Sequence, residues 1–182
     1  MKSMIRFNAY ISLFLFSFSF HSFAVDMNFK GELLDSPCII DPNNSDIDVT
    51  LRDIPALNMN YLPGKSVEMP FQIKLINCNL NQAGAISIYF NGETEEGMGN
   101  LQHKYLKVSG QNEGKIGLGV LDEQGELVTI GEGDSGYPIE INDENITVNF
   151  SAFIKSTPDA LENKSVVADN YSARATFEVR YE

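Results

Sequence analysis

One glycine-rich hexapeptide carries the residue types that chemistry most often needs. Residues 131–136 read Gly-Glu-Gly-Asp-Ser-Gly, which fits both a dinucleotide-binding GxGxxG pattern and the GDSG around a protease nucleophile. Nucleotide binding needs a helix directly afterwards, but Tyr137-Pro138-Ile139 starts no helical pattern. A serine protease needs a histidine held by an aspartate, and His103 lies between glutamine and lysine instead. We therefore expect a hairpin tip here and no enzymatic activity.

Two sets of polar residues have spacings found in metal or carboxylate sites. Asp41, Asn43 and Ser45 match the start of a calcium loop, but its sixth position is Asp46 where glycine is required, and its twelfth is Arg52. Glu93, Glu95 and Glu96 lie between glycines, which predicts a solvated loop rather than paired catalytic acids. The sequence predicts no metal and no cofactor.

The two cysteines, Cys38 and Cys78, predict a disulfide. They are forty positions apart, and the chain contains no CxxC pair that would favour a metal site or a reactive thiol. Disulfides persist in exported proteins. In the loop-closure model, a bridge of this span stabilises the fold by roughly 4 kcal/mol.

The first 24 residues have the pattern of a secretory signal peptide. Lys2 and Arg6 precede the apolar run Ala9–Phe20, and Ser22-Phe23-Ala24 supplies the small residues of a cleavage site. The alternative, a membrane anchor, needs about 20 apolar residues. Cleavage removes two of the 13 basic residues and none of the 25 acidic ones, so the formal charge changes from −12 to −14. Such an acidic chain is a poor candidate for binding nucleic acid or an anionic membrane.

The rest of the chain is patterned as β-strands. Apolar residues alternate with polar ones, which is typical of strands with one buried face. Turn formers separate the runs, and only Thr157–Leu161 suggests a helical turn. About seven strands with one disulfide favour an immunoglobulin-like sandwich. The alternating positions are Met27/Phe29/Gly31/Leu33, Ile47/Val49/Leu51, Val67/Met69/Phe71/Ile73/Leu75, Ile86/Ile88/Phe90, Ile116/Leu118/Val120, Ile146/Val148/Phe150/Ala152 and Tyr171/Ala173/Ala175/Phe177/Val179/Tyr181.

The two terminal strands are unusual for a self-sufficient sandwich. The first alternating run begins almost at the start of the mature chain, and the last carries large apolar residues up to Tyr181, one residue from the end. Open apolar sheet edges invite pairing with another chain. Strand donation between chains is therefore a natural hypothesis.

An ordered set of short motifs resembles the fimbrial subunits (pilins) of the chaperone–usher pathway, and is most similar to P-pilus adaptor and minor tip subunits. The set consists of Phe29-Lys30-Gly31-Glu32-Leu33-Leu34, Cys38, Leu75-Ile76-Asn77-Cys78, Leu106-Lys107-Val108, Gly117–Asp122, Thr157–Leu161, Lys164–Val167 and the terminal Ala173–Glu182 with its penultimate tyrosine. Where many family members carry a glycine before the last strand, this chain has Asp169.

The resemblance implies a fold and an assembly mechanism. The fold is all-β, an incomplete immunoglobulin-like β-sandwich that lacks its final strand and is completed by a donor strand. The implied organisation is a signal peptide at residues 1–24, a donor-strand extension at 25–34 and a pilin domain at 35–182. The donor residues would be Met27, Phe29, Gly31 and Leu33. The groove-edge and chaperone-binding strand would comprise Tyr171, Ala173, Ala175, Phe177, Val179, Tyr181 and Glu182.

The implied partners are a periplasmic chaperone, an outer-membrane usher and neighbouring subunits, in a fimbria on the surface of a Gram-negative bacterium. Basic residues of the chaperone would hold the carboxylate of Glu182. A major rod or terminator subunit is the alternative within the class. Residues 25–34 could instead be the first strand of this domain's own sheet. From another class, the alternative is a self-contained secreted β-sandwich that binds a ligand.

Overall fold

The computed structural model describes residues 38–79, 86–131 and 136–181. These residues belong to one compact unit that comprises residues 35–182. The predicted signal peptide, the predicted donor residues and Glu182 lie outside the described residues. In the described part, no helix has the length and apolar character needed to cross a membrane.

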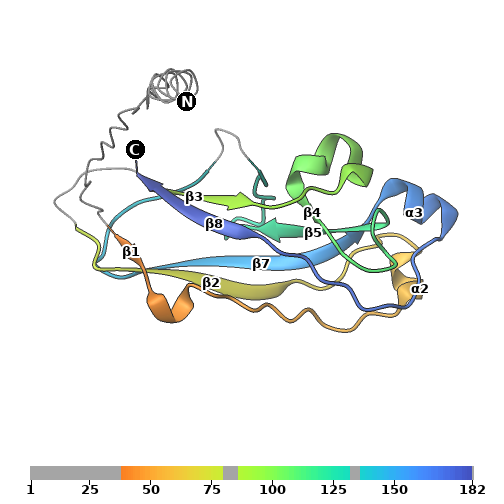
Figure 1. The fold of residues 1–182 in the computed structure, drawn as a ribbon, viewed down its shortest axis with the longest axis horizontal. Coiled ribbons are helices and arrows are strands. Elements are labelled where there is room, and N and C mark those ends of the chain that lie inside the picture. The colour runs from red at the N-terminus through yellow and green to blue at the C-terminus, as the bar shows by residue number, and fades with distance from the viewer. Residues whose placement is uncertain (1–37, 80–85, 132–135, 182) are drawn as a thin grey trace, which may run out of the picture. The chain divides into compact units, whose positions relative to one another are not determined.

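Five antiparallel strands form the larger sheet (Figure 1). Their order is β1-β2-β7-β5-β4. The central pairing joins β2 to β7, with Phe71 opposite Phe150 and Ile73 opposite Val148. The strands are β1 (Ile39–Ile40), β2 (Met69–Ile76), β4 (Tyr105–Lys107), β5 (Ile116–Leu121) and β7 (Ile146–Ser156).

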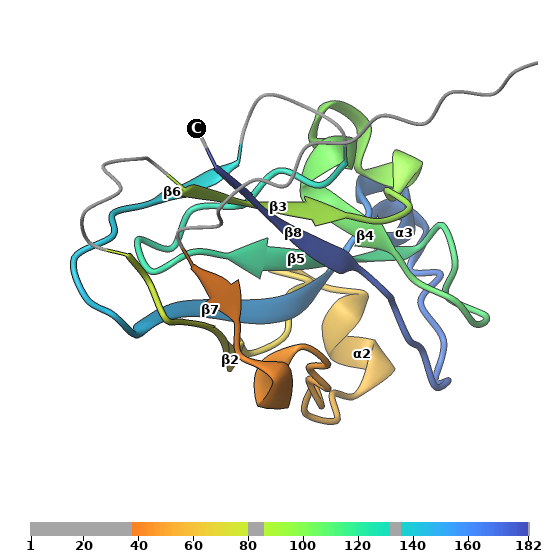
Figure 2. The ribbon, with the colours of Figure 1, turned by 60° about the vertical axis from the view of Figure 1, so that its left-hand side comes forward.

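Three strands form the second sheet, in the order β6-β3-β8. They are β3 (Ile86–Asn91), β6 (Tyr137–Ile139) and β8 (Thr176–Tyr181). One apolar core contains Ile73 and Phe150 from the larger sheet and Ile88 and Phe90 from the smaller one, so the sheets pack face to face. β8 ends the order of the smaller sheet and lies beside β3 (Figure 2).

Short helices connect the strands. They are η1 (Pro42–Asn44), α2 (Ala56–Met59), η2 (Glu96–Lys104) and α3 (Pro158–Asn163). The predicted helical turn at Thr157–Leu161 is confirmed as α3. The Thr157 Oγ1 caps it by accepting a hydrogen bond from the backbone N–H of Ala160 at 3.2 Å, and proline occupies the first helical position.

Phe150 is the centre of the aromatic packing between the sheets. It is 3% exposed. Its ring stacks on Phe71 at 5.6 Å between centroids and meets Phe90 and Tyr137 edge-on at 5.1 and 5.4 Å. Burying a large apolar side chain contributes about 1.5–3 kcal/mol, and such aromatic pairs add to it.

Most of the alternating runs form the predicted strands. Those around Ile73, Ile88, Leu118 and Phe150 become β2, β3, β5 and β7. The prediction that Val67 belongs to this strand is wrong, because Val67 lies before β2 and its side chain is 56% exposed. The predicted strand at Ile47–Leu51 is also wrong: the backbone there belongs to no strand, although the side chains still alternate between half-buried and exposed.

The polar motifs have structural roles. Asp41 caps η1 by accepting a hydrogen bond from the backbone N–H of Asn43 at 2.9 Å. The expectation of a solvated loop holds for Glu93 and Glu96 but is wrong for Glu95, which is 4% exposed. The Glu95 carboxylate accepts hydrogen bonds from the backbone N–H groups of Gly97 and Gly114, at 3.0 and 3.2 Å. It therefore fastens η2 to the loop before β5.

Candidate binding groove

A groove of 720 Å³ opens between two stretches of chain that lie far apart in sequence. Residues 47–54, the N-side rim, form one wall, and residues 171–177, the C-side rim, form the other. Core side chains of both sheets line its floor. The floor residues are Phe71, Phe90, Leu106, Ile116, Leu118, Val120, Ala152 and Ile154.

The N-side rim has the side-chain pattern of a strand without the hydrogen bonds of one. Ile47, Val49 and Leu51 are half-buried, and the polar residues between them are exposed. In the part of the chain that the structure describes, residues 47–54 make no backbone hydrogen bond. The apolar positions therefore face the groove, and the N–H and C=O groups have no strand beside them.

The C-side rim has the same character. Residues 173–175 make no backbone hydrogen bond to any described residue. Beyond them, β8 has β3 as its only strand neighbour within the described ranges. In an antiparallel pair, every second residue points its N–H and C=O away from the partner. Within the described ranges, both walls of the groove therefore contain backbone donors and acceptors without a backbone partner.

Two asparagines fix the backbone beside the α2 end of the groove, which we call its closed end. Asn60 donates a side-chain hydrogen bond to the carbonyl of Val166 and accepts one from its N–H, both at 2.9 Å. Asn112 makes the same pair of bonds with Val167, at 2.8 and 2.9 Å. Each amide thus replaces a neighbouring strand and fixes the backbone that leads into the C-side rim.

Tyr171 stands at this closed end. It packs against the cluster of Met59, Ile154 and Val166. Burial raises the pKa of its phenol, and the negative charge of Asp53 on the N-side rim raises it further. The neutral phenol is therefore favoured in the groove wall.

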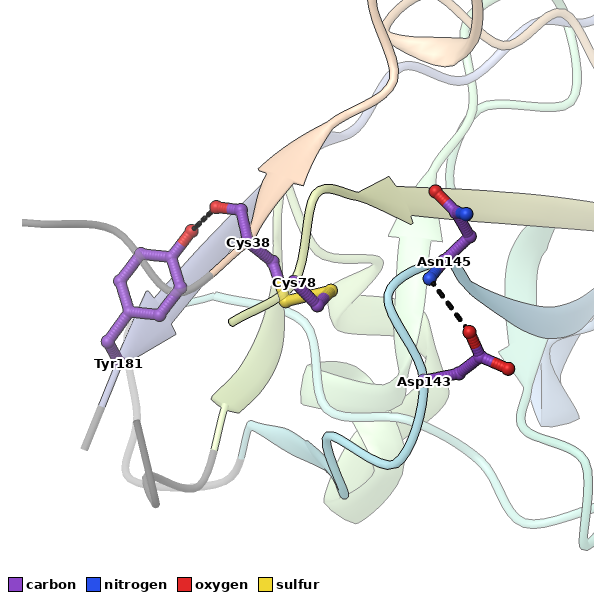
Figure 3. Close-up of a disulfide and its surroundings, with 5 residues drawn as sticks. All are labelled: Cys38, Cys78, Asp143, Asn145 and Tyr181. Atoms are coloured by element: carbon purple, nitrogen blue, oxygen red, sulfur yellow. Dashed lines mark hydrogen bonds between the residues drawn. A yellow bond between two sulfur atoms is a disulfide. The ribbon is translucent and has the colours of Figure 1, made fainter. Parts of the chain in front are cut away.

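Beyond the groove, the end of β8 is fastened to the residues of the disulfide (Figure 3). Cys38 and Cys78 are bonded, as the sequence predicts. The hydroxyl of Tyr181 donates a hydrogen bond to the carbonyl of Cys38 at 2.7 Å. The last residues of β8 are thereby tied to the start of the described chain.

The predicted groove-edge residues differ in where they lie. Tyr171, Ala173, Phe177 and Val179 are half-buried against the core, whereas Ala175 and Tyr181 are exposed. Tyr171, Ala173, Ala175 and Phe177 line the groove; Val179 and Tyr181 are not among its lining residues. The strand itself begins only at Thr176, later than the alternation suggests.

Sequence reasoning missed three features of the groove. The N-side rim was read as an ordinary strand, and Asn60 and Asn112 were not singled out. Their only signal is an asparagine beside a half-buried apolar segment, which many surface turns share. Asp169, where many family members have glycine, does not adopt a positive φ. Its carboxylate accepts a hydrogen bond from the N–H of Gln111 at 2.8 Å, so the turn is fixed without glycine.

Known proteins with similar sequences are fimbrial. PapK, a fimbrial adapter of Escherichia coli, is 32% identical over 98% of this chain and 99% of its own. PrsK of Escherichia coli is 33% identical with the same coverage. A putative minor fimbrial subunit of Proteus mirabilis, PmfF, is 26% identical over 86% of this chain and 84% of its own.

The solved structures confirm the fold. The P pilus rod subunit PapA superimposes with a TM-score of 0.67 at 20% identity, covering 81% of this chain and all of that one. A subunit of a chaperone–usher pilus gives 0.64 at 21% identity, covering 90% and 99%. The predicted all-β, incomplete immunoglobulin-like sandwich is thus confirmed. The family model described as "Fimbrial protein" matches residues 27–182. The chain therefore belongs to the fimbrial protein family.

Proposed function

We propose that this chain is a minor or adaptor subunit of an adhesive fimbria and works by strand complementation. Its groove takes a strand first from a periplasmic chaperone and then from the next subunit. Its own residues 25–34 fill the groove of the preceding subunit. The outer-membrane usher is the site of that exchange, and the assembled fimbria is extracellular. The function is structural, with no chemical reaction.

The observation that carries this proposal is an apolar floor between residues 47–54 and 173–175, whose backbone groups make no hydrogen bond to another described backbone group. An extended segment placed between residues 47–54 and 171–177 would find backbone partners on both sides and apolar pockets beneath. This is strand addition, in which main-chain bonds supply affinity and alternate side chains supply specificity. A self-contained sandwich would have its core covered and these rims bonded.

The predicted donor segment suits such a groove in length and pattern. A strand rises about 3.3 Å per residue, so the ten residues 25–34 would extend about 33 Å. The lining stretch 166–177, when extended, has a similar length. Met27, Phe29, Gly31 and Leu33 would share one face of the donor, because alternate side chains point the same way.

The adaptor role is favoured over the rod role by sequence. The adapter PapK shares 32% identity over nearly the whole chain, whereas the rod subunit PapA shares 20% in the structural superposition. A rod or terminator subunit is the second candidate.

The chaperone would bind along β8 and at the C-terminus. Tyr181 is 43% exposed, and the free edge of β8 leads directly to Glu182. A chaperone strand could pair with this edge while basic residues hold the terminal carboxylate.

The proposal is tested on the mature chain, Val25–Glu182, with and without a peptide of residues 25–34. We expect the peptide to raise the melting temperature and to suppress aggregation of the chain produced without a chaperone. The matched control is the same peptide with Phe29→Asp and Leu33→Asp, which keeps the backbone but not the apolar face. A chain that is monomeric without the peptide and melts at the same temperature with it would be a complete sandwich, and the proposal would be wrong.

A second experiment examines donation. Deleting residues 25–34 should leave a subunit that is exported and retained by its chaperone but cannot fill the groove of the preceding subunit. The control deletes no residue and replaces the same segment with a Gly/Ser stretch of equal length. Fibres of normal length from the deletion strain would contradict the donor assignment.

A further inference from the structure

Three large apolar residues are exposed on α2 and the turn after it, next in sequence to Ala56 and Met59 of the groove lining. They are Leu57, Tyr61 and Leu62, which are 65%, 51% and 86% exposed. We call these three residues the end patch. In Figure 1, α2 and α3 lie at the end of the domain opposite the C-terminus of β8.

The end patch stands on a well-anchored turn. The N–H of Gly64 bonds to the carbonyl of Tyr61 at 2.7 Å, and the carbonyl of Gly64 accepts from the N–H of Ser156 at 2.8 Å. The Lys164 Nζ lies 4.7 Å from the centroid of the Tyr61 ring. Three large apolar side chains are therefore presented to solvent on fixed backbone, which is typical of an interaction surface.

Connectivity determines what can reach this patch. In this chain the predicted strand-donating segment, residues 25–34, is followed by only three residues before Cys38, and we take the same spacing for the donating neighbour. At about 3.6 Å per residue, the folded domain of the donating subunit must begin within about 15 Å of the end of its inserted strand. The direction of that strand in the groove therefore decides which end of this domain the neighbour touches.

Only one direction of the inserted strand, relative to β8, builds an extended fibre. Cys38, the first described residue, lies at the Tyr181 end of the domain, since the Tyr181 hydroxyl bonds to the Cys38 carbonyl. An incoming strand parallel to β8 would bring the next subunit to that same end, where the preceding subunit already lies. An antiparallel strand places the next subunit at the α2 end, which gives the head-to-tail contact that extends into a filament.

The neighbouring domain would meet the α2 end with the side that carries its disulfide. In this chain that side is partly apolar. Ile39 and Tyr181, beside the disulfide, are 45% and 43% exposed. Repetition of the contact would bring the Ile39 and Tyr181 side of one subunit against the end patch of another. Two partly apolar surfaces at opposite ends of one domain match the requirement of a head-to-tail interface.

We propose that Leu57, Tyr61 and Leu62 are a docking surface for the folded domain of the subunit whose N-terminal strand fills the groove. The neighbouring subunit is then held by contacts of its folded domain as well as by its inserted strand. This inference rests on the proposed function, and a second copy of this chain carries the surface that it requires.

The test compares a strand alone with a strand that carries its domain. The mature chain is mixed with a fluorescent peptide of residues 25–34 or with a fluorescent second copy of the mature chain, and dissociation is followed by fluorescence anisotropy. We expect the second copy to dissociate at least tenfold more slowly than the peptide. In the L57D/L62D variant this difference should disappear, while peptide dissociation stays within twofold of the unaltered chain.

Two further variants complete the design. L101D introduces the same charge at an apolar residue of η2 that is 46% exposed, and both dissociation rates should stay unchanged. L62S alters the most exposed residue of the patch and cannot disturb packing, so it replaces the double variant if that variant loses peptide binding; we expect it to speed release of the second copy about threefold.

The outcomes separate the inference from the function on which it rests. If the peptide and the second copy dissociate at equal rates, or if L57D/L62D and L62S release the copy as slowly as the unaltered chain does, the end patch is not a docking surface although the groove binds a strand. If the unaltered chain binds neither probe, its groove does not accept its own extension and the docking inference fails, whereas the proposed function is judged by the deletion of residues 25–34.

Discussion

Two regions of this domain have the same residue pattern and different backbones. In β2, Phe71, Ile73 and Leu75 alternate with polar residues, and seven register pairs join the strand to β7. In the N-side rim, Ile47, Val49 and Leu51 alternate in the same way, but residues 47–54 belong to no strand. The two segments share the same alternation of apolar and polar residues, but only β2 is hydrogen-bonded to a neighbouring strand of the described chain.

The difference shows that alternation reports a buried face, whereas a strand also needs a neighbour. β2 finds β7 within the same chain. Between the N-side rim and the C-side rim, the described chain provides no strand, so the groove stays open over the core. Leaving a backbone N–H or C=O without a partner is costly once it is buried, but these rims are in contact with solvent. We call the part of the domain whose strands are paired, centred on β2 and β7, the closed half. The groove with its two rims is the open half.

The largest expected effect is in the closed half. Phe150→Ala removes the ring that contacts Phe71, Phe90 and Tyr137, and we expect it to lower the free energy of unfolding by about 3–5 kcal/mol. Because Phe150 is buried and only its neighbours Phe71 and Phe90 line the groove, the loss should be large both with and without the peptide of residues 25–34. Urea denaturation measures both values.

Leu51→Ala is the matched variant in the open half. Its side chain is only half-buried, so the loss in the free chain should be smaller, and it should grow once the peptide covers the groove. Equal losses for Leu51→Ala in the two states would show that the groove is not where the strand binds.

An intermediate effect is expected at the closed end of the groove. Asn112→Ala leaves the N–H and C=O of Val167 without their side-chain partners, and we expect a loss of about 1–3 kcal/mol. Peptide affinity should fall as well, since the start of the C-side rim is released. Isothermal calorimetry and urea denaturation give the two quantities.

The control for that substitution is Asn163→Ala, which removes exposed bonds to Asp159 on α3. It should change stability little and peptide affinity not at all. If Asn112→Ala weakened the fold but left peptide affinity intact, the asparagine would only stabilise the domain and would not shape the groove.

The smallest effect concerns pH. Burial raises the pKa of Tyr105 in the closed half, and burial together with Asp53 raises the pKa of Tyr171 in the open half. A raised phenol pKa means that the folded state favours the neutral form. The associated stability is present below pH 10 and is lost as the pH rises above it.

Asp53→Asn separates the two tyrosines. It removes the charge that acts on Tyr171 and leaves Tyr105 untouched, so the alkaline loss of stability should become slightly smaller but not vanish. Thermal melts between pH 8 and 11 provide the measurement. An unchanged pH profile in Asp53→Asn would mean that the two rims do not interact electrostatically at Tyr171.

The sequence predicted the closed half well because its signals are local and redundant. The runs around Ile73, Ile88 and Phe150 carry period-two alternation between clear turns, and two cysteines in an exported chain leave little choice of partner. The open half was predicted less well. Alternation at Ile47–Leu51 and Tyr171–Ala175 is correct for the side chains, but hydrogen bonding there depends on a strand that the described chain lacks.

Polar contacts between residues far apart in sequence also limited what could be predicted from the sequence. Nothing local distinguishes Asn60 and Asn112 from surface asparagines, because their partners, Val166 and Val167, lie 106 and 55 positions away. The burial of Glu95 was missed for the same reason, since one of its two N–H donors is Gly114 in a distant loop.

The disulfide also determines how tension would travel through the subunit in a fibre. A pull on the N-terminal extension reaches the domain at Cys38, immediately before β1, which has only two residues paired with β2. Two register pairs would peel apart under a modest load. The covalent bond to Cys78 delivers the force instead to the chain just after β2, whose eight residues lie beside β7 in the centre of the larger sheet. Mechanical strength at this junction is therefore set by the β2–β7 pairing rather than by the short edge strand.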